Sequence, residues 1–459
     1  MMDPRAYVQE LVEASREAQQ RFAAFEQGRV DRVVRAAGKS VYDHAESLAR
    51  LAVEETGMGR YEDKVQKNKG KSKVTWYRLK GQKSRGIVRR IESSGIVEIA
   101  HPMGVIGAIT PTTNPTMTPM HNAMIALKGG NSLIVCPHPR SRRTAVRTVE
   151  IMNEAILRAG APENLIQIVP EPTVEMSRLV MALCDVCIST GGSSMVSAAY
   201  SSGKPAFGVG QGNVQALVDR DVPLTEVVPM LVKGRVYDYG VLCTCEQSVF
   251  CPSEKLAAMM SLFALEGAYC VETPREVNAL RATLFHDGVL NKECVGIAPA
   301  RLAAMSGFSV PQDTRLLVVR AEGTGSEDSL SREKLCPVLS VYGYRLWEDA
   351  VEMACANLRC EGMGHSAIIH SNTQEHIEYA AVRLPVSRIG VNQIGSSGLG
   401  GTLTNGLNPT GTLGCGSWGN NSLSENLWFT HLINISRIAY PLPAGTLPTD
   451  EEIWAEETL

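Results

Sequence analysis

The residue that could do chemistry most directly is a cysteine, Cys243, in the segment Tyr-Asp-Tyr-Gly-Val-Leu-Cys-Thr-Cys-Glu-Gln-Ser at 237–248. The glycine before the thiol and the polar residues after it predict a loop that enters a strand. A thiolate there could attack a carbonyl carbon and carry the product as a thioester. Cys245 would lie on the same face of such a strand, so the spacing leaves both cysteines open, and filling the core is the alternative for either.

An amide side chain offers the second half of such chemistry. Asn114 lies in the segment Pro-Thr-Thr-Asn-Pro at 111–115, and the proline after it favours an extended backbone. Its NH2 group, together with the backbone N–H of the nucleophile, could bind the negative oxygen that develops when a carbonyl is attacked. An asparagine that only forms a turn is the alternative. Together, Cys243 and Asn114 predict attack on a carbonyl and a covalent thio-intermediate.

Glycine-rich turns indicate how a nucleotide could be held. The segment Thr190-Gly191-Gly192-Ser193 follows a predicted strand and opens a predicted helix, the setting in which backbone N–H groups bind phosphate. The segment at 208–213 has glycines at alternate positions, but a strand and not a helix is predicted after it. We therefore predict a turn there whose backbone passes close to a ligand.

A basic segment follows the predicted strand that ends at Cys136. The cofactor ribose often lies at such a strand end, where a carboxylate favours a free 2′-hydroxyl. The segment at 137–143 contains no acid, so His138 and Arg140 are expected to bind a 2′-phosphate. This favours NADP as the cofactor, with NAD possible, and a solvated helix start is the alternative.

The elements that position these residues alternate along the chain. Helices are predicted over 5–56, and residues 64–90 carry eleven Lys or Arg, which predicts either a solvated face or a rim that attracts a phosphorylated cofactor. Strands are then predicted at 96–100, 104–109, 132–136, 165–169 and 186–190, with helices at 117–129, 143–159, 173–183 and 193–201. Such alternation predicts an α/β fold whose parallel sheet is covered on both faces.

The second half of the chain partly repeats this pattern. Helices are predicted at 253–267, 274–284 and 346–358, and strands near 315–319, 338–342, 366–370 and 388–392. The polar, glycine-rich stretch 394–426 is predicted to be a functional loop, and 432–441 a strand shared between subunits. We expect a cofactor-binding domain with the N-terminal helices at 1–232, a thiol-bearing catalytic domain at 233–426, and an oligomerisation segment at 427–459.

Composition argues against several classes of function. The chain has 459 residues, 44% apolar and 20% charged, with a net charge of -3, which is typical of a soluble globular protein without a nucleic-acid or membrane partner. No apolar run approaches the ~20 residues of a membrane helix, and the N-terminus lacks a signal-peptide core, so we expect a cytoplasmic protein. Most of the twelve cysteines have apolar neighbours and are expected to be thiols. Cys184 and Cys187 have no matching second pair, so no metal is expected.

Taken together, these segments resemble the acylating, coenzyme A-dependent members of the aldehyde dehydrogenase family over nearly the whole chain. The stretches that carry this resemblance are 102–115, 137–140, 199–206, 237–249, 414–419 and 424–426. Within the family, Glu54–Gly59 with Glu62–Val65 and the ending His431–Ile438 look most like coenzyme A-dependent succinate semialdehyde dehydrogenases. The resemblance implies two Rossmann-like α/β domains and a small oligomerisation strand, in a homodimer or homotetramer.

The resemblance also implies roles for single residues. Cys243 matches the nucleophile, which makes Cys245 a bystander, and Asn114 matches the oxyanion donor. Glu333 matches the glutamate that holds the nicotinamide ribose. The full set of expected cofactor-binding residues is Thr112, His138, Arg140, Thr190, Gly191, Gly192, Ser193, Gly210 and Glu333. His365 and Thr410 are assigned to substrate or coenzyme A.

The implied activity is the reversible, NAD(P)-dependent interconversion of an aldehyde and its acyl-coenzyme A through a cysteine thioester. Succinate semialdehyde is the favoured aldehyde, with acetaldehyde or sulfoacetaldehyde as alternatives. Its distal carboxylate would need a cation or several donors, with Lys233, Arg235 and the polar groups of 402–412 as candidates. Tyr239 and Gln211 depart from the family pattern and leave the substrate preference open.

The chemistry favours a thiol acceptor over water. The segment 208–213 has no acid where hydrolytic relatives carry the glutamate that activates water. The rivals are a phosphorylating or hydrolytic relative that uses the same thiol, and a noncatalytic nucleotide-binding scaffold.

Overall fold

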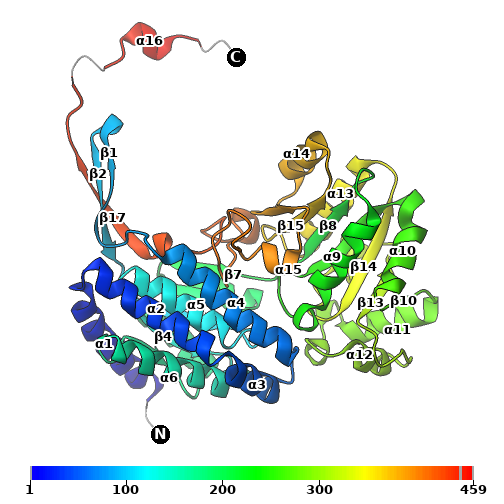
Figure 1. Ribbon diagram of the computed structural model, residues 1–459, viewed down its shortest axis with the longest axis horizontal. Helices are drawn as coiled ribbons and strands as arrows, with labels where there is room; N and C mark the ends of the chain where they lie inside the picture. Colours follow the sequence, from blue (N-terminus) through cyan, green and yellow to red (C-terminus); the bar gives the residue numbers. More distant parts are fainter. Residues whose placement is uncertain (1–2, 444–446, 457–459) are drawn as a thin grey trace.

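The computed structural model describes residues 3–443 and 447–456. Helices cover both faces of a five-stranded sheet in the N-terminal part (Figure 1). The N-terminal helices are α1 (Pro4–Ala23), α2 (Gln27–Asp43), α3 (Ala45–Thr56) and α4 (Tyr61–Leu79). The strands of this sheet are β3 (Val105–Thr110), β4 (Ser132–Pro137), β5 (Ile166–Ile168), β6 (Val186–Thr190) and β7 (Ala206–Val209), and the helices between them are α5 (Met117–Lys128), α6 (Arg142–Arg158), α7 (Val174–Leu183) and α8 (Ser193–Tyr200).

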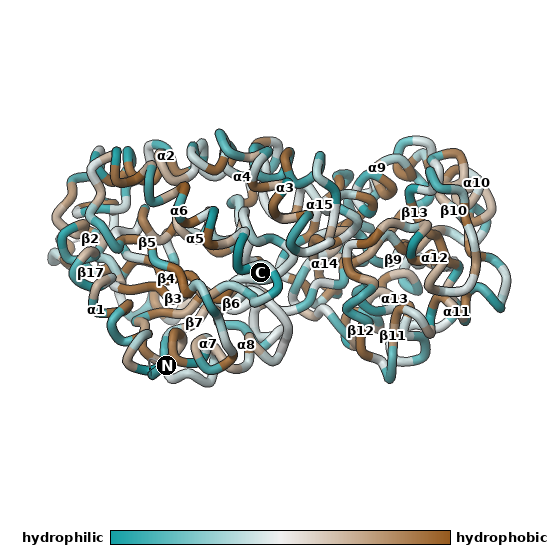
Figure 2. Tube along the Cα trace, turned by 90° about the horizontal axis from the view of Figure 1, so that it is seen from below, coloured by the Kyte–Doolittle hydropathy of each residue, from teal (hydrophilic) through white to brown (hydrophobic). Residues whose placement is uncertain are grey.

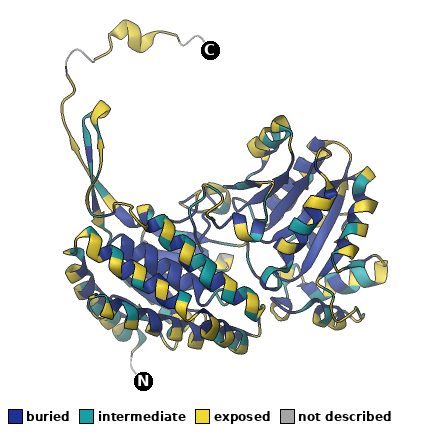
Figure 3. Ribbon diagram, viewed as in Figure 1, coloured by how far each residue is buried: buried dark blue, intermediate teal, exposed yellow. Residues whose placement is uncertain are grey.

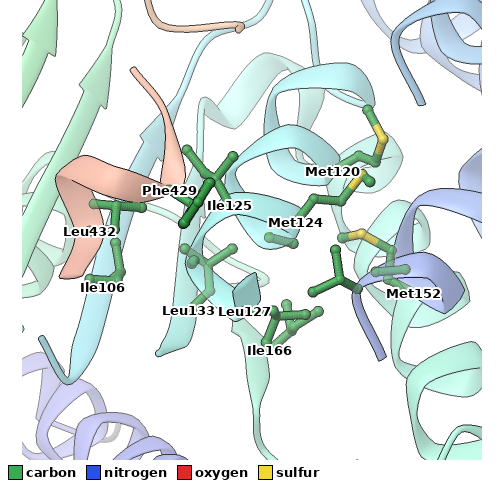
Figure 4. Packing of buried hydrophobic residues seen from close by; sticks show 14 of the residues in the cluster. Ile106, Met120, Met124, Ile125, Leu127, Leu133, Met152, Ile166, Phe429 and Leu432 are labelled. Carbon is green, nitrogen blue, oxygen red and sulfur yellow. The ribbon is translucent and has the colours of Figure 1, made fainter. Parts of the chain in front are cut away.

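The strands of this first sheet run parallel in the order β5-β4-β3-β6-β7. On one face, α2, α4, α5 and α6 bury a common apolar core, to which Figure 4 shows Met120, Met124 and Ile125 contributing from α5 and Leu133 from β4. On the other face, α1 packs against α7 and the sheet through Val8 and Val12. Figure 2 shows apolar residues gathered along β3 and β4, as expected for strands covered on both faces.

A seven-stranded parallel sheet forms the second unit, in the order β10-β13-β14-β9-β8-β15-β16. Its strands are β8 (Val214–Val218), β9 (Glu246–Pro252), β10 (Ala268–Val271), β13 (Leu316–Arg320), β14 (Val338–Tyr344), β15 (Ala367–His370) and β16 (Ile389–Val391). Its helices are α9 (Leu224–Val236), α10 (Leu256–Leu265), α11 (Pro274–Leu284), α12 (Pro299–Met305), α13 (Trp347–Cys360), α14 (Gln374–Arg383) and α15 (Gly395–Gly398). A short hairpin, β11 (Phe285–His286) with β12 (Val289–Leu290), completes it. Figure 3 shows the strands of both parallel sheets buried beneath helices whose outer faces are exposed.

A small antiparallel sheet projects from the first unit (Figure 1). It consists of β1 (Gly86–Ile91), β2 (Ile96–Pro102) and β17 (Ile433–Ala439), in the order β1-β2-β17. The final helix, α16 (Asp450–Trp454), lies beyond it. The expected C-terminal strand therefore pairs with a hairpin from the first quarter of the chain, and β17 forms one edge of the sheet.

The predicted fold class, α/β with two parallel sheets and a small additional strand element, is confirmed. The expected domain boundary after residue 232 does not coincide with the division between the two sheets. Strand β8 pairs with β9 and β15 of the second sheet, and α9 packs on that sheet, although both elements begin before residue 232. We propose that the change between the two α/β units falls at 210–213, between β7 and β8.

Candidate active site

A cavity of about 380 Å³ lies where the two units meet, and it collects residues from distant parts of the sequence. Helix α4 supplies Lys67 and Lys71, and the turn after β3 supplies Asn114. The segment after α9 supplies Cys243, and the polar stretch around α15 supplies Thr410. The predicted nucleophile and the predicted oxyanion donor thus line the same cavity, and the stretch 394–426 contributes to its wall as expected of a functional loop.

The two neighbouring cysteines differ in their surroundings. Cys243 lines the cavity and is partly exposed, whereas Cys245 is fully buried and its backbone N–H donates to the carbonyl of Leu242 at 3.0 Å. The turn before them is tight, since Asp238 and Tyr239 both have left-handed φ angles of 51° and 50°. Geometry therefore separates the cysteines where spacing could not, and only Cys243 reaches the cavity.

The environment holds the Cys243 sulfur as a thiol. Burial raises the pKa of Cys243 to about 12, and the carboxyl of Glu333 and the thiol of Cys415 act in the same direction. The guanidinium of Arg388 and the backbone N–H of Cys243 itself oppose this rise in pKa. Arg388, which the sequence did not single out, is thus a cation that favours the thiolate form of Cys243.

The amide of Asn114 is held through its oxygen. Lys67 Nζ donates to Asn114 Oδ1 at 2.6 Å, and the Nδ2 group has only a long contact of 3.4 Å to Thr113 Oγ1. Because an ammonium only donates hydrogen bonds, the oxygen of the amide must face Lys67. The NH2 group of Asn114 is left for other partners in the cavity.

The glycine turn at 208–213 packs against the nucleophile. A side chain on Gly212 would place its Cβ 2.3 Å from the carbonyl oxygen of Cys243, and the Gly212 N–H donates to Glu333 Oε1 at 3.0 Å. The sequence predicted that this backbone passes close to a ligand. Among the described residues, the backbone of Gly212 passes close to Cys243, the predicted nucleophile. Gln211 Nε2 donates to Glu361 Oε1 at 3.1 Å, and neither Gln211 nor Tyr239 lines the cavity.

The turn after β6 is open to a ligand. A Cβ on Gly191 or Gly192 would meet nothing within 4 Å, and the backbone passes directly into α8. Thr190 Oγ1 lies 2.9 Å from Thr412 Oγ1, and the side chain of Ser193 is outside the described part of the structure. Open backbone at a helix N-terminus leaves room for a nucleotide phosphate, and the binding of one there stays a prediction. A Cβ on Gly210 would also meet open space, while Thr112 lies in the turn after β3.

A carboxylate from α3 binds the first backbone N–H groups of α6, the helix that follows the strand end predicted to hold a ribose. Glu55 of α3 accepts the backbone N–H of Arg143 at 2.8 Å and that of Thr144 at 2.7 Å, at the start of α6. The segment 137–143 itself has no acid, and Glu55 reaches the start of this helix from 88 residues upstream. His138 and Arg140 are both exposed beside it, and His138 Nδ1 accepts the Arg140 N–H at 3.1 Å.

The two residues assigned to substrate or coenzyme A lie in different places. Thr410 lines the cavity, and its hydroxyl donates to the carbonyl of Thr412 at 3.1 Å. His365 is fully buried outside the cavity lining, and neither ring nitrogen has a hydrogen-bond partner among the described residues. Burial and the nearby Arg388 lower the pKa of His365 to about 3, so its ring is neutral.

Lysines of α4 are the principal residues that sequence reasoning missed. Lys67 and Lys71 lie four residues apart, on the helix face that meets the cavity, and Lys71 Nζ donates to the carbonyl of Gly400 at 2.7 Å. Burial lowers the pKa of Lys71 to about 8, although Cys243 opposes this. The basic segment was read as a solvated face or a rim, but its four-residue spacing could have indicated a functional face.

Of the two cations that the sequence offered for the distal carboxylate of the substrate, one lines the cavity and one does not. Lys233 lines the cavity from α9. Arg235 is fully buried and donates to the backbone carbonyls of Val338 and Cys336, so its assignment to the substrate was wrong. Among the described residues, no cluster of His, Cys, Asp or Glu could hold a metal, and no helix is long and apolar enough to cross a membrane.

Comparisons with known proteins point in one direction. The sequence profile of the aldehyde dehydrogenase family matches residues 3–268. The chain is 46% identical over 453 residues to a succinate-semialdehyde dehydrogenase (acetylating) from Clostridium kluyveri, covering 99% of this chain and 100% of that protein.

Solved structures agree with this sequence likeness. An acetylating aldehyde dehydrogenase from Geobacillus thermoglucosidasius superposes with a TM-score of 0.93 at 35% identity, covering 97% of this chain and 98% of that one. A Rhodopseudomonas palustris propionaldehyde dehydrogenase, solved with bound CoA and an acylated cysteine, gives a TM-score of 0.83 at 26% identity and covers 94% of this chain and 96% of that one.

Proposed function

This chain belongs to the aldehyde dehydrogenase family and is an acylating member of it, and we propose that it interconverts succinate semialdehyde and succinyl-coenzyme A through a thioester on Cys243. The observation that carries the proposal is one cavity lined by the thiol of Cys243, the amide of Asn114 and the partly buried lysine Lys71. The thiol and amide fit acyl transfer, and the lysine fits the distal carboxylate of the substrate.

In the proposed first step, Cys243 gives its proton to solvent and its sulfur attacks the aldehyde carbon, so that an S–C bond forms and the carbonyl oxygen becomes an oxyanion. When that oxygen re-forms the carbonyl, the hydrogen on the same carbon leaves as hydride and a thioester results. The NH2 group of Asn114 and the backbone N–H of Cys243 donate to that oxygen. Such donors act before the charge develops and need no rearrangement when it does. A bound nicotinamide supplies the hydride acceptor in this direction and the hydride donor in the reverse direction.

The acceptor of the acyl group follows from the turn at 208–213. No acid lies in this turn, and its Gly212 N–H donates to an oxygen of Glu333, so the turn itself supplies no base that activates water against the thioester. The coenzyme A thiol attacks instead, which releases the acyl group and returns the Cys243 thiol. Thioester exchange between thiols needs less base assistance than hydrolysis does, which supports coenzyme A as acceptor.

We propose that the cofactor lies across the carboxyl ends of β3, β4 and β6. Thr112, Gly191, Gly192 and the start of α8 would meet its phosphates, and Glu333 its nicotinamide ribose. Burial and the neighbouring Glu361 raise the pKa of Glu333 well above its ordinary value, so it is suited to donate as well as accept hydrogen bonds with a ribose.

Lys71 supports a substrate that carries a second negative charge. Among the described residues, the ammonium of Lys71 donates a hydrogen bond to the backbone carbonyl of Gly400 and not to a carboxylate. Its positive charge is therefore not balanced by an ion pair. Lys67, by contrast, is paired with Asp238 at 2.6 Å. A charged group that is partly removed from water binds an anion strongly, which fits succinate semialdehyde better than acetaldehyde.

We expect Lys71→Met to raise the KM for succinyl-coenzyme A about 30-fold, which corresponds to the free energy of one hydrogen bond to a charged group. The KM for acetyl-coenzyme A should be unchanged. Because the Lys71 amine is charged only below its pKa of about 8, kcat/KM of the wild type for succinyl-coenzyme A should fall as the pH rises through that value. NADPH consumption with each substrate between pH 6.5 and 9.5 measures both. Equal losses for both substrates would contradict the assignment.

The specific aldehyde is tested by turnover with succinyl-, acetyl- and sulfoacetyl-coenzyme A. A preference for the succinyl compound supports the proposal, whereas a preference for the sulfonate would assign Lys71 to that group instead. Sustained aldehyde oxidation without coenzyme A would favour a hydrolytic enzyme and remove the proposal.

The cofactor preference remains a proposal, with NADP favoured by the exposed pair His138 and Arg140. We expect Arg140→Ser to raise the KM for NADPH about tenfold and to leave that for NADH within twofold, since only the former carries the 2′-phosphate. Steady-state kinetics with both cofactors measure this. An equal effect on NADH would show that Arg140 does not meet that phosphate.

We also propose that the protein is a homodimer or homotetramer. Strand β17 is the edge of the small projecting sheet and is mostly exposed along Asn434–Ala439. An edge strand presents unpaired backbone groups to a second copy. Light scattering of the purified protein distinguishes these assemblies from a monomer.

A further inference from the structure

A buried lysine connects the two halves of the active site. Lys67 of α4 is 6% exposed, and its ammonium donates to Asn114 Oδ1 at 2.6 Å and to Asp238 Oδ2 at 2.6 Å. Asn114 follows a strand of the first sheet, while Asp238 lies five residues before Cys243 in the second unit. One ammonium therefore contacts both the segment that carries the oxyanion donor and the segment that carries the nucleophile.

The acidic partner of Lys67 is itself tightly held. Asp238 is fully buried, its Oδ1 accepts the Arg60 N–H at 2.9 Å, and its own N–H donates to Asp63 Oδ2 at 2.9 Å. Although burial favours the neutral form, Lys67 and Lys64 hold the pKa of Asp238 below its ordinary value. The carboxylate is thus charged, and its left-handed backbone is fixed on both sides. Strain of this kind persists only where surrounding contacts determine the conformation.

We infer that Lys67 is a positioning residue that sets the orientation of the Asn114 amide for oxyanion binding. An ammonium cannot accept a hydrogen bond, so it excludes the flipped amide, in which NH2 would face Lys67 and the oxygen would face the cavity. A flipped amide would present a partial negative charge to the oxyanion and oppose the reaction. This inference rests on the proposed roles of Cys243 and Asn114.

The same contact also aligns the amide with the nucleophile. Lys67 donates hydrogen bonds to Asp238 and to Asn114 at the same time. These two contacts hold the turn at 237–240 in a fixed position relative to the amide of Asn114. The polarised amide N–H bonds become stronger donors when a cation contacts the oxygen. Orientation, alignment and polarisation all predict a loss in the chemical step and not in substrate binding.

Helix α4 offers a matched control in Lys64. It is also buried and donates to the same Asp238 Oδ2 at 3.1 Å, but Asn114 is not among its described partners. Lys64→Met therefore removes a buried ammonium from the same carboxylate while leaving Lys67 on Asn114. A purely structural role in neutralising Asp238 predicts similar effects of Lys64→Met and Lys67→Met, whereas a role through the amide predicts different ones.

The test is a double-mutant cycle with Lys67→Met, Asn114→Ala and the double variant, with Lys64→Met in parallel. We expect Lys67→Met to lower kcat about 100-fold with KM within about twofold, as for loss of an oxyanion donor. In the Asn114→Ala background, Lys67→Met should lower kcat less than about threefold, because the amide through which Lys67 acts is absent. Lys64→Met should lower stability, because it breaks a buried ion pair, but should retain kcat within about threefold of the wild type, because Lys67 still contacts both Asp238 and Asn114.

Two further measurements keep the result decisive. Lys67→Gln removes the charge but retains a donor for Asn114, so it should recover part of the lost kcat if it folds where Lys67→Met does not. The rate at which iodoacetamide alkylates Cys243 reports whether the nucleophile segment is intact, and it should change little in Lys67→Met.

Additive losses in the cycle, or an equal loss in Lys64→Met, would overturn the role of Lys67. Failure of the wild type to show any coenzyme A-dependent turnover would instead overturn the proposed function. The two failures are therefore distinguishable in one set of assays.

Discussion

Cys243→Ser is expected to abolish turnover, with kcat lowered by about 10⁴-fold or more, as when the nucleophile of a covalent mechanism is removed. A hydroxyl in the same place ionises far less readily than a thiol, so it should not attack the acyl group of acyl-coenzyme A. Incubation of the wild type with an acyl-coenzyme A, followed by mass spectrometry of the peptide containing residues 237–248, should locate the acyl group on Cys243. The variant should carry none.

The neighbouring thiol provides the control. Cys245 is fully buried and does not line the cavity, so Cys245→Ser should retain kcat within about threefold and lose only stability. An acyl group found on Cys245, or activity that survives Cys243→Ser, would remove the proposed mechanism. Loss of acylation in both variants would indicate damage to the loop rather than loss of the nucleophile.

Asn114→Ala is expected to lower kcat by about 10²- to 10³-fold while the KM for acyl-coenzyme A stays within about threefold. The amide donates to the oxygen only when charge develops there, so its removal affects the transition state more than the bound substrate. Single-turnover acylation of Cys243, followed by rapid quenching and mass spectrometry, separates this step from cofactor release.

Thr113→Ala is the matched control for this variant. Thr113 precedes Asn114 and touches its Nδ2 only at 3.4 Å, so the change should leave kcat within about threefold. A rise in KM at unchanged kcat in Asn114→Ala would mean that the amide binds substrate uniformly and does not stabilise an oxyanion.

Much of the fold could be predicted because local patterns carry it. The alternation of apolar strands with amphipathic helices from 96 to 201 determines a parallel sheet, and the helical spacing of Val8, Val12 and Phe22 determines the face that α1 buries. Helix α9 was missed although Leu224, Val227, Val228, Leu231 and Val232 are buried at helical spacing, and Pro229 in its interior is the residue that argues against a helix. The boundary between units depends on which sheet β8 joins, and pairing partners far apart in the chain are not encoded locally.

The candidate site was predictable where chemistry is local to a short motif. Cys243, Asn114 and the turn at 190–193 stood out by residue type and neighbours. Lys71 and Glu55 did not stand out, because their roles depend on residues far away in the chain. Lys71 contacts Gly400, several hundred residues downstream, and Glu55 contacts Arg143, 88 residues downstream. Burial decided the remaining cases: it placed Arg235 and His365 outside the cavity lining, although both residue types suit a site.

The contact between Gly212 and Cys243 limits how such an enzyme can evolve. With the main-chain oxygen of the nucleophile 2.3 Å from where any Cβ at 212 would lie, no single substitution at that codon can bring in an acid without displacing the nucleophile itself. A lineage that passed from thiol acceptors to water would have to install its base at a different position or first remodel this turn. Main-chain packing therefore closes position 212 to an acid, whereas Gly210 in the same turn has open space where its Cβ would lie.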